Sequence, residues 1–284
     1  YKKANMIFSG KTTVVRLCGG LGNQIFQLGA ALLLTSKGSN ELIILDDYAL
    51  SSYKALREFE LSKFIELSKS DVQVVLKRLA ITRFRIPRML PFKHRAIPFV
   101  NDNNFQFIID GNKSQYRLLD GYFQDLRQQD FEDISALLKP LLLDKFCKLN
   151  QLESETCVIH IRGGDFVKLG WNKSTPKIYY INAMNMMRDK HDVNNFVIVT
   201  DDEPYARTII SCKSADIKII SSDIADDFQT IASYSKRILS ASTFALWASV
   251  IGVNDGGGVV IAPNEFTPGI KRDFLLPNER RSNA

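Results

Sequence analysis

Apolar positions in this chain fall into short runs that alternate with segments of helical composition. Thr12–Cys18 is short, apolar and rich in β-branched residues, which predicts a buried strand. A glycine-rich turn follows, then Asn23–Lys37 with the composition of a helix and Gly38 just beyond its end. Glu41–Leu45 predicts the next strand. Strand, glycine turn, helix and strand in this order indicate the start of a parallel α/β unit.

The pattern is less regular from residue 51 to about residue 100. We expect a helix over Asp71–Ile81, strands over Phe105–Asp110 and Arg117–Gly121, and a helix over Phe131–Leu138. The polar stretch Cys147–Glu155 then separates this part from a more regular series. We therefore predict two domains, residues 6–150 and 151–284.

The second series alternates strands and helices at short, even spacing. Strands are predicted at Thr156–Ile161, Asn195–Thr200, Asp216–Ile220, Arg237–Ser240 and Val259–Ile261. Helices are predicted at Ile178–Arg188, Glu203–Ser211, Asp227–Tyr234 and Thr243–Ile251. This alternation predicts a doubly wound parallel sheet.

Composition places the chain among globular proteins, with 45% apolar and 24% charged residues. The net charge of +6 favours anionic partners without choosing among them. No apolar run reaches the length of about 18 residues that spans a bilayer, and no signal-peptide pattern is visible. Because Cys18 and Cys157 fall in predicted buried strands, we expect a reducing, cytoplasmic location.

Three strand ends carry residues suited to anions. The first is Gly19, Gly20 and Gly22 followed by Asn23, where glycine lets backbone N–H groups approach a ligand at a helix start. A tight structural turn is an equally good interpretation. The spacing fits neither the dinucleotide-binding nor the Walker pattern.

The second strand end is the segment His160–Asp165, with the sequence HIRGGD. Alternation along the strand directs His160 and Arg162 to the same side. Arginine offers a planar, permanently charged fork for phosphate oxygens, and the two glycines leave room for a ligand. The alternative is an Arg162–Asp165 ion pair that stabilises a turn.

The third strand end is Ser240–Phe244, a strand-to-helix junction. Its hydroxyl and N–H groups suit phosphate binding, helix capping or both.

Together these segments resemble a known family. Gly19–Gln27 (GGLGNQIFQ), Gly121–Gln124 (GYFQ), His160–Asp165, Phe196–Asp202 and Asp227–Trp247 occur in the order seen in family 11 glycosyltransferases. These are the α-1,2-fucosyltransferases of bacterial surface polysaccharides and blood-group antigens. The resemblance covers about residues 14–265.

The resemblance implies a GT-B-like α/β fold, with two facing Rossmann-like domains, parallel sheets and the donor site in the C-terminal half. It implies a donor site formed by Gly20, Gly22, Asn23, His160, Arg162, Asp227, Ser242, Thr243 and Phe244. By the same resemblance, Arg162 holds the β-phosphate, His160 contacts guanosine and Asp227 pairs with the guanine edge.

Two departures from the family pattern leave the donor sugar open. Gly163 stands where the family usually has a second arginine, and Ala241 stands where it has an asparagine. We therefore expect GDP-fucose or a related donor such as GDP-colitose, with a non-catalytic nucleotide- or glycan-binding relative as the alternative.

The expected reaction is an inverting transfer of L-fucose to the 2-hydroxyl of a β-galactoside, free or lipid-linked, in a surface polysaccharide. No Asp-x-Asp triplet occurs, so we expect no metal cofactor, although Asp46-Asp47 and Asp201-Asp202 are alternative Mg²⁺ candidates. Surface or capping roles suit both acid pairs better. Asp165 and Asp125 are both candidates for the general base.

A basic stretch at residues 77–95 contains seven Lys or Arg residues and no acid, with apolar residues between them. It is either a solvated surface or a dock for anionic lipid at the inner face of the membrane. We expect no nucleic-acid partner, because no recognised nucleic-acid motif is present. An oxidoreductase would need a G-x-G-x-x-G fingerprint, which is missing.

Overall fold

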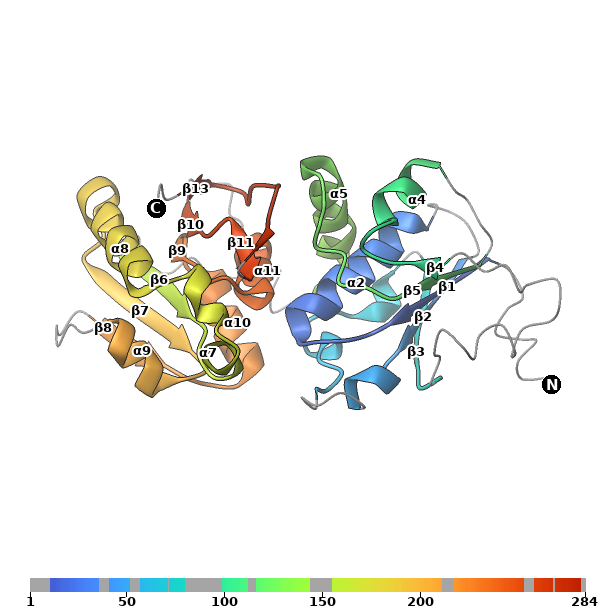
Figure 1. Cartoon of the computed structure of the whole chain (residues 1–284), viewed down its shortest axis with the longest axis horizontal. Helices are drawn as coiled ribbons and strands as arrows, with labels where there is room; N and C mark the ends of the chain where they lie inside the picture. Colours follow the sequence, from blue (N-terminus) through green and yellow to red (C-terminus); the bar gives the residue numbers. More distant parts are fainter. Residues whose placement is uncertain are drawn as a thin grey trace. The chain divides into compact units, whose positions relative to one another are not determined.

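The computed structural model describes residues 11–35, 41–51, 57–70, 72–79, 99–111, 116–143, 155–210, 217–252, 258–267 and 269–281 (Figure 1). The chain divides into two compact units, Tyr1–Leu143 and Asp144–Ala284. Each unit is an α/β structure built on a parallel sheet. This confirms the predicted α/β class with parallel sheets.

The first unit contains a five-stranded parallel sheet with the order β3-β2-β1-β5-β4. Its strands are β1 (Lys11–Arg16), β2 (Glu41–Asp46), β3 (Gln73–Lys77), β4 (Phe99–Val100) and β5 (Tyr116–Leu119). Its helices are α2 (Leu21–Leu34), α4 (Phe105–Gly111) and α5 (Gln128–Leu138). Short 3-10 turns are η1 (Tyr48–Ser51), η2 (Leu61–Lys63), η3 (Leu67–Lys69) and η5 (Lys139–Leu141).

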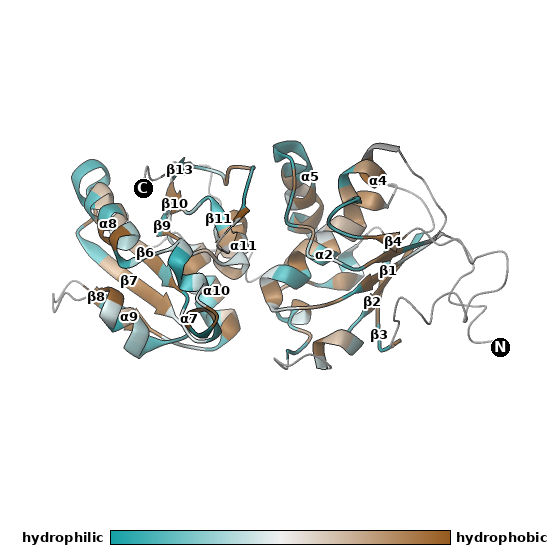
Figure 2. Ribbon diagram, in the orientation of Figure 1, coloured by the Kyte–Doolittle hydropathy of each residue, from teal (hydrophilic) through white to brown (hydrophobic). Residues whose placement is uncertain are grey.

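Helix α2 packs on β1 and β2 and against α5. The two helices approach closely at Gly29, where an added Cβ would lie 2.4 Å from Cγ2 of Ile134. Val14, Ile44 and Leu118 are cross-strand neighbours that form a buried cluster within the sheet. Figure 2 shows the apolar residues concentrated along these strands. Burying each such side chain stabilises the fold by about 1.5–3 kcal/mol.

Two predicted elements of the first unit are wrong. Residues 73–77 form strand β3 instead of a helix, because the β-branched pair Val74 and Val75 suits pairing with β2.

Residues 105–111 form helix α4 instead of a strand. Its start is set by Asn101, whose Oδ1 accepts the N–H groups of Asn103 and Asn104 at 3.0 and 3.3 Å. This side-chain turn outweighs the β propensity of the apolar residues that follow.

The second unit contains a six-stranded parallel sheet with the order β13-β10-β9-β6-β7-β8 and a small antiparallel pair, β11-β12. Its strands are β6 (Thr156–Ile161), β7 (Asn195–Thr200), β8 (Ile217–Ile220), β9 (Lys236–Ile238), β10 (Val259–Ala262), β11 (Glu265–Thr267), β12 (Ile270–Lys271) and β13 (Glu279–Arg281). Its helices are α7 (Asp165–Lys168), α8 (Lys177–His191), α9 (Glu203–Ile209), α10 (Ile224–Ser233) and α11 (Thr243–Ile251), with a 3-10 turn η6 (Trp171–Ser174).

The two faces of this sheet have different partners. Cys157, Ile159 and Ile161 belong to a buried cluster with residues of α8 and α9. The alternate residue His160 contacts Phe244 of α11 instead, with ring centroids 5.8 Å apart. The buried Arg237 donates to carbonyls at the ends of both α10 and α11, and burial lowers its pKa to about 10. Its bonds fix the two helices on that face.

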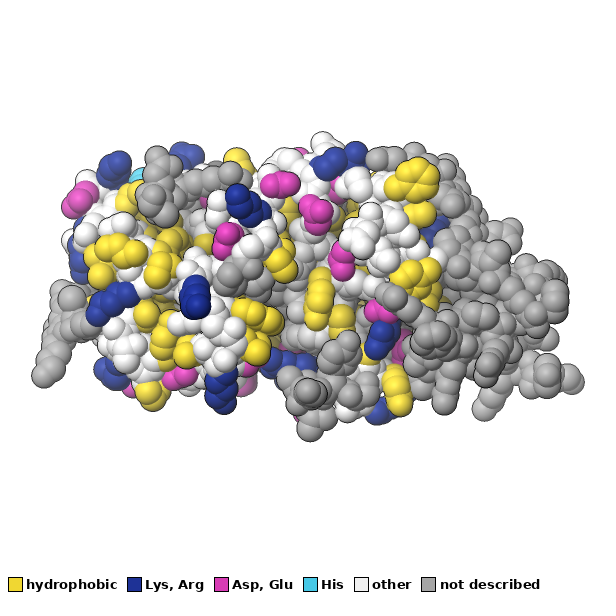
Figure 3. Space-filling view, in the orientation of Figure 1, with side chains coloured by type: hydrophobic (Ala, Val, Ile, Leu, Met, Phe, Trp, Pro, Cys, Tyr) yellow, Lys and Arg dark blue, Asp and Glu magenta, His cyan; other side chains and the backbone are white. Residues whose placement is uncertain are grey.

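In the part of the chain that the structure describes, no helix is long and apolar enough to cross a membrane. On the face shown in Figure 3, basic and acidic side chains are interspersed. Of the basic stretch, Lys77 ends β3, and Arg78 donates to Ser51 and lies 5.7 Å from the ring centroid of Tyr48. Residues 80–95 lie outside the described residues, so the membrane contact stays a prediction.

Candidate functional site

The topology of the second unit marks one edge of its sheet as a ligand-binding edge. Strands β6 and β9 are neighbours, but the chain leaves β6 toward β7 and β8 and leaves β9 toward β10. Open α/β sheets bind ligands beyond the carboxyl ends of their strands at such a reversal. The segments at that place are 162–164 after β6 and 239–242 after β9. Both segments belong to strand ends that the sequence predicts to be suited to anions.

His160 and Ser240 join these two strand ends. Nδ1 of His160 lies 2.7 Å from Oγ of Ser240, and the histidine is only 4% exposed. Its ring neighbour Phe244 also packs against Phe228, with centroids 5.3 Å apart. Burial, with a contribution from the charge of Arg162, lowers the pKa of His160 to about 3. The ring is therefore neutral at physiological pH.

The guanidinium of Arg162 bridges two carboxylates. Its Nη2 lies 2.8 Å from Oδ1 of Asp165, and its Nη1 lies 2.7 Å from Oδ2 of Asp201. The Arg162 side chain is 24% exposed, and its Cζ lies 5.4 Å from the ring centroid of Phe166. The Arg162–Asp165 ion pair offered as the alternative interpretation is thus present. A phosphate would have to compete with both carboxylates for the charge of Arg162.

The loop after β6 is held by the acid pair after β7. Gly163 N–H donates to Asp201 at 2.8 Å, and Gly164 N–H donates to Asp202 at 3.0 Å. Asp202 also caps α9 by accepting the N–H of Tyr205 at 3.0 Å, as the capping interpretation predicts. These backbone bonds lower its pKa. A Cβ at position 163 would lie 2.3 Å from Cβ of Asp202, which explains why no second arginine stands there.

Asp227 belongs to the same cluster of charges. It lies in the first turn of α10, and its Oδ1 accepts the N–H of Ser222 at 3.1 Å. Burial raises the pKa of Asp227 to about 6, and the nearby acids Asp223 and Asp201 add to the shift. The electrostatic influence of Asp201 places Asp227 near the carboxylate that binds Arg162.

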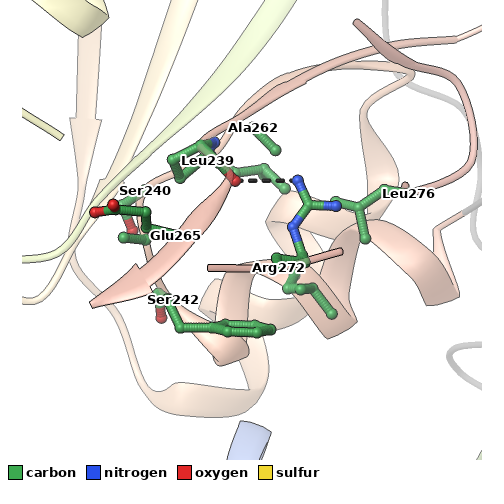
Figure 4. A pocket seen from close by; sticks show the side chains of 11 residues that line it. Leu239, Ser240, Ser242, Ala262, Glu265, Arg272 and Leu276 are labelled. Carbon is green, nitrogen blue, oxygen red and sulfur yellow. Dashed lines mark hydrogen bonds between the residues drawn. The ribbon is translucent and has the colours of Figure 1, made fainter. Parts of the chain in front are cut away.

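A small pocket opens at the start of α11 (Figure 4). Ser240, Ser242, Glu265 and Arg272 are among the residues that line it. Ser242 is the N-cap residue of α11, but its own side chain makes no capping bond. The helix start therefore depends on other acceptors, which fits an anion-binding role.

Arg272, one of the residues that line this pocket, belongs to a buried ion pair. Arg272 binds Glu279 through two bonds of 2.7 and 2.6 Å, and both side chains are at most 2% exposed. Arg272 also donates to the carbonyl of Pro263 at 3.0 Å, the contact drawn in Figure 4. All of these bonds lie within the fold, so we assign Arg272 a structural role.

In the first unit, the glycines of the predicted ligand loop have three different environments. Gly19 has φ +77°, a backbone conformation that favours glycine. Gly20 precedes α2, and an added Cβ there would meet no atom within 4 Å. Gly22 is buried in the first turn of α2. The loop thus combines a structural turn with one open position.

The start of α2 is occupied by a carboxylate of the protein itself. Leu21 N–H donates to Oε2 of Glu60 at 2.9 Å. The buried Gln24 fixes the same segment, because its amide donates to the carbonyl of Glu58 at 2.8 Å and accepts the N–H of Glu60 at 3.0 Å. The glutamine of the GGLGNQ motif therefore positions Glu60.

The two sequence motifs of the first unit meet where β1 and β5 lie side by side, a second reversal of winding. Gln27 donates to the carbonyl of Gly121 at 2.9 Å, and Gln124 donates to Oδ1 of Asn23 at 2.9 Å. Hydrogen bonds therefore hold GGLGNQ against GYFQ. Asp125, a candidate base, is exposed on the loop that follows.

Comparison with known proteins decides the family, because the sequence profile of Glycosyl transferase family 11 matches residues 2–273. The chain is a family 11 glycosyltransferase. It is similar to the O-antigen biosynthesis glycosyltransferase WbnK of Escherichia coli, with 25% identity over 300 residues that cover 91% of this chain and 96% of the relative. It is also similar to an alpha-1,2-colitosyltransferase of Escherichia coli, with 24% identity over 284 residues that cover 92% and 93%.

Among solved structures, the crystal structure of the fucosyltransferase NodZ from Bradyrhizobium has a TM-score of 0.52 at 10% identity, covering 86% of this chain and 92% of NodZ. At this identity the likeness shows the fold alone. It confirms that the family 11 enzyme has the predicted GT-B-like fold.

The predicted site residues of the enzyme fall into two groups, each within one unit. At the strand ends of the second unit lie His160, Arg162, Asp165, Asp227, Ser242, Thr243 and Phe244. At the strand ends of the first unit lie Gly20, Gly22 and Asn23. The contacts of each group are those described above, and the donor-binding roles stay predictions.

Two acidic residues that contact or line these segments were missed. Glu60 lies 39 positions from its partner Leu21, and Glu265 lines the pocket from β11. No motif or spacing marks either one. The available signal for Glu60 was indirect: Gly20 at the start of α2 has no side chain to cap the helix, so its N–H groups need an acceptor from elsewhere.

Proposed function

We propose that this enzyme transfers L-fucose from GDP-fucose to the 2-hydroxyl of a β-galactoside, free or lipid-linked, in an O-antigen-type repeat. The linkage and the polysaccharide are supported by the two Escherichia coli relatives, one an alpha-1,2-transferase and one an O-antigen enzyme. The donor is supported by the motif resemblance to α-1,2-fucosyltransferases. The observation that carries the donor site is Arg162 at the β6–β9 reversal, in the same unit as the N-terminus of α11.

In this proposal the second unit binds GDP. Arg162 holds the β-phosphate, while backbone N–H groups at Ser242 and Thr243 contact a phosphate at the helix start. His160 and Asp227 contact the guanosine. Phe244 packs behind His160 and keeps its ring in place. Gly20, Gly22 and Asn23 of the first unit are the remaining donor-binding residues of this proposal.

The proposed chemistry is a single displacement with inversion. The acceptor oxygen forms a bond to the anomeric carbon as the bond from that carbon to the phosphate oxygen breaks, and GDP leaves with the electron pair. Arg162 and helix N-termini stabilise the charge that develops on the leaving group. We propose that no metal takes part, which requires full activity in EDTA; loss of activity there would remove this part of the proposal.

GDP-colitose is the second candidate donor, because the colitosyltransferase relative matches over 93% of its own length. The test is to incubate the enzyme with a β-galactoside and either GDP-fucose or GDP-colitose, and to determine the product linkage by NMR. A 2-linked fucoside supports the proposal, and a 2-linked colitoside obtained only from GDP-colitose selects the alternative donor. Transfer to another hydroxyl, or from neither donor, contradicts the proposal.

We also propose that the enzyme works on the cytoplasmic side of the inner membrane and contacts anionic lipid through residues 77–95. Their basic and apolar residues suit an anionic lipid surface. Co-sedimentation with liposomes that increases with the anionic lipid content supports this contact, and co-sedimentation independent of that content removes it.

A further inference from the structure

Exposed apolar side chains are concentrated in one segment of the second unit. Among the described residues, eleven large hydrophobic side chains are exposed, and five of these lie within residues 167–181. The five are Val167, Leu169, Trp171, Ile178 and Ile181, and Leu169 and Ile178 are 57% and 58% exposed. Exposed apolar residues usually occur singly, whereas a group of them marks an interaction site.

The five side chains come from consecutive elements. Val167 belongs to α7, Leu169 follows the end of that helix, and Trp171 begins η6. Ile178 and Ile181 lie three positions apart in α8, so they share one face of the helix. In Figure 3, hydrophobic and basic side chains are visible over the part of the second unit where Figure 1 labels α7 and α8.

Hydrogen bonds anchor the turn between α7 and α8 to the rest of the unit. Nδ2 of Asn172 donates to the hydroxyl of Tyr205 in α9 at 3.1 Å. Oγ of Ser174 donates to the carboxylate of Glu265 in β11 at 3.1 Å. Trp171, in the same turn, is 38% exposed. The anchored turn therefore holds part of the indole ring at the surface.

The same segment is basic. Lys168, Lys173 and Lys177 are exposed between the apolar side chains, and no Asp or Glu occurs from residue 166 to residue 188. Nζ of Lys177 donates to the carbonyl of Thr208 at 3.1 Å. A lysine covers apolar surface with its aliphatic stem and directs its ammonium group toward water or an anionic headgroup. The segment thus combines apolar contact area with positive charge.

Acidic residues beside this segment are engaged within the fold. Asp165, at the start of α7, binds Arg162 at 2.8 Å. Glu203, in the neighbouring helix α9, binds Arg207 at 2.6 Å. Asp202 accepts two backbone N–H groups at 3.0 Å each. The lysines therefore set the sign of the charge that the segment itself presents.

We propose that this segment docks on an anionic lipid bilayer. The five apolar side chains and three lysines named above form the docking surface, here called the α7–α8 surface. Its leucine and isoleucine side chains suit the outer part of the hydrocarbon, its tryptophan suits the lipid–water interface, and its lysines suit anionic headgroups. A protein partner fits less well, because protein interfaces are depleted of lysine.

The α7–α8 surface belongs to the second unit, whereas residues 77–95 belong to the first. It begins in α7, whose first residue Asp165 lies three positions after Arg162. Docking through this surface therefore brings the proposed donor site close to the bilayer, where a lipid-linked acceptor is held. This consequence rests on the proposed function, but the docking itself does not.

Tryptophan fluorescence tests the docking directly. The chain has two tryptophans, of which Trp247 is only 1% exposed and Trp171 lies on the α7–α8 surface. Vesicles of phosphatidylglycerol with brominated acyl chains should quench the emission of Trp171 in the wild-type enzyme, because docking brings the indole ring against lipid. Trp171→Phe, which retains an aromatic ring, should still bind these vesicles but lose the quenching.

A pair of double variants tests the role of charge. Lys168→Gln/Lys173→Gln removes two charges from the α7–α8 surface, and Lys190→Gln/Lys218→Gln removes two exposed charges elsewhere in the same unit. We expect the first variant to bind phosphatidylglycerol vesicles about tenfold more weakly in co-sedimentation, and the second to bind nearly like wild type. Because all four side chains are exposed, both variants should keep the melting temperature of wild type.

Quenching of wild type that is lost in Trp171→Phe, together with weaker binding by Lys168→Gln/Lys173→Gln, supports docking through the α7–α8 surface. Absence of quenching in wild type, or equal binding by the two double variants, overturns the inference. Transfer to a soluble β-galactoside is measured separately, without vesicles, and should be the same in both double variants. If wild type transfers no sugar in that assay, the proposed function fails while the docking result stands.

Discussion

Nη1 of Arg162 lies 2.7 Å from Oδ2 of Asp201, while the other oxygen of Asp201 accepts the N–H of Gly163 at 2.8 Å. One carboxylate therefore holds both the proposed phosphate-binding cation and the loop that follows it. In the proposed donor site, the diphosphate and Asp201 would compete for the same guanidinium.

Asp201→Asn tests this competition. The amide oxygen can still accept the N–H of Gly163, but the negative charge is gone. Because the ion pair is partly exposed, we expect GDP to bind only about two- to fivefold more tightly, as measured by calorimetry. Glu203→Gln is the control, since Glu203 pairs with the exposed Arg207 at 2.6 Å. Weaker GDP binding by Asp201→Asn would show that Asp201 assists the donor site instead of competing with it.

Position 163 should not tolerate a side chain. An added Cβ would lie 2.3 Å from Cβ of Asp202, so Gly163→Ala should destabilise the enzyme by about 1–3 kcal/mol. Gly163→Arg, which places the arginine usual in the family, should be at least as unstable and should not raise activity. Thermal unfolding is the measurement, with Gly20→Ala as a control at a position where a Cβ meets nothing. An unchanged melting temperature for Gly163→Ala would contradict the described loop.

His160 should make the fold sensitive to mild acid. Its pKa is lowered from 6.5 to about 3, so the folded state binds fewer protons than the unfolded state between these values. Stability is then lost as the pH falls below 6.5, by up to about 1.4 kcal/mol per pH unit. His160→Gln removes this titration. The free energy of unfolding, compared between about pH 6.5 and 5, should depend less on pH in the variant; equal slopes would mean that His160 is not buried as described.

Asp227→Asn should separate stability from function. Because the pKa of Asp227 is raised to about 6, its ionised form is unfavourable in the folded state, and stability is lost as the pH rises through that value. The variant should therefore unfold at a higher temperature than wild type at neutral pH, yet bind GDP more weakly because the guanine partner is changed. Asp226→Asn, an exposed neighbour, should do neither. Unchanged GDP affinity in Asp227→Asn would refute its proposed role.

Most of the second unit could be predicted from the sequence because its buried strands are short apolar runs between polar turns. Strands β6 and β7 and helix α11 have the predicted bounds. The first unit was harder, since α4 begins at an asparagine turn and β3 is only half buried. Local propensity alone did not show that α4 is a helix and that β3 is a strand.

The strand-end residues of the site could be found because parallel strands bring their carboxyl ends to one edge of a sheet. Their partners could not. The contact of Leu21 with Glu60 spans 39 positions, and that of Gly163 with Asp201 spans 38. Such contacts depend on tertiary packing, which no local pattern encodes. The sequence therefore indicated Arg162 but not that Asp201 pairs with it.

The turnover of Arg162→Ala with GDP-fucose and a β-galactoside tests the central claim most directly. If Arg162 stabilises the leaving diphosphate, kcat should fall by about 100-fold or more while the fold stays intact. Arg207→Ala, which removes an exposed arginine of the same unit, should transfer sugar at the wild-type rate. Turnover of Arg162→Ala close to that of wild type would contradict the account.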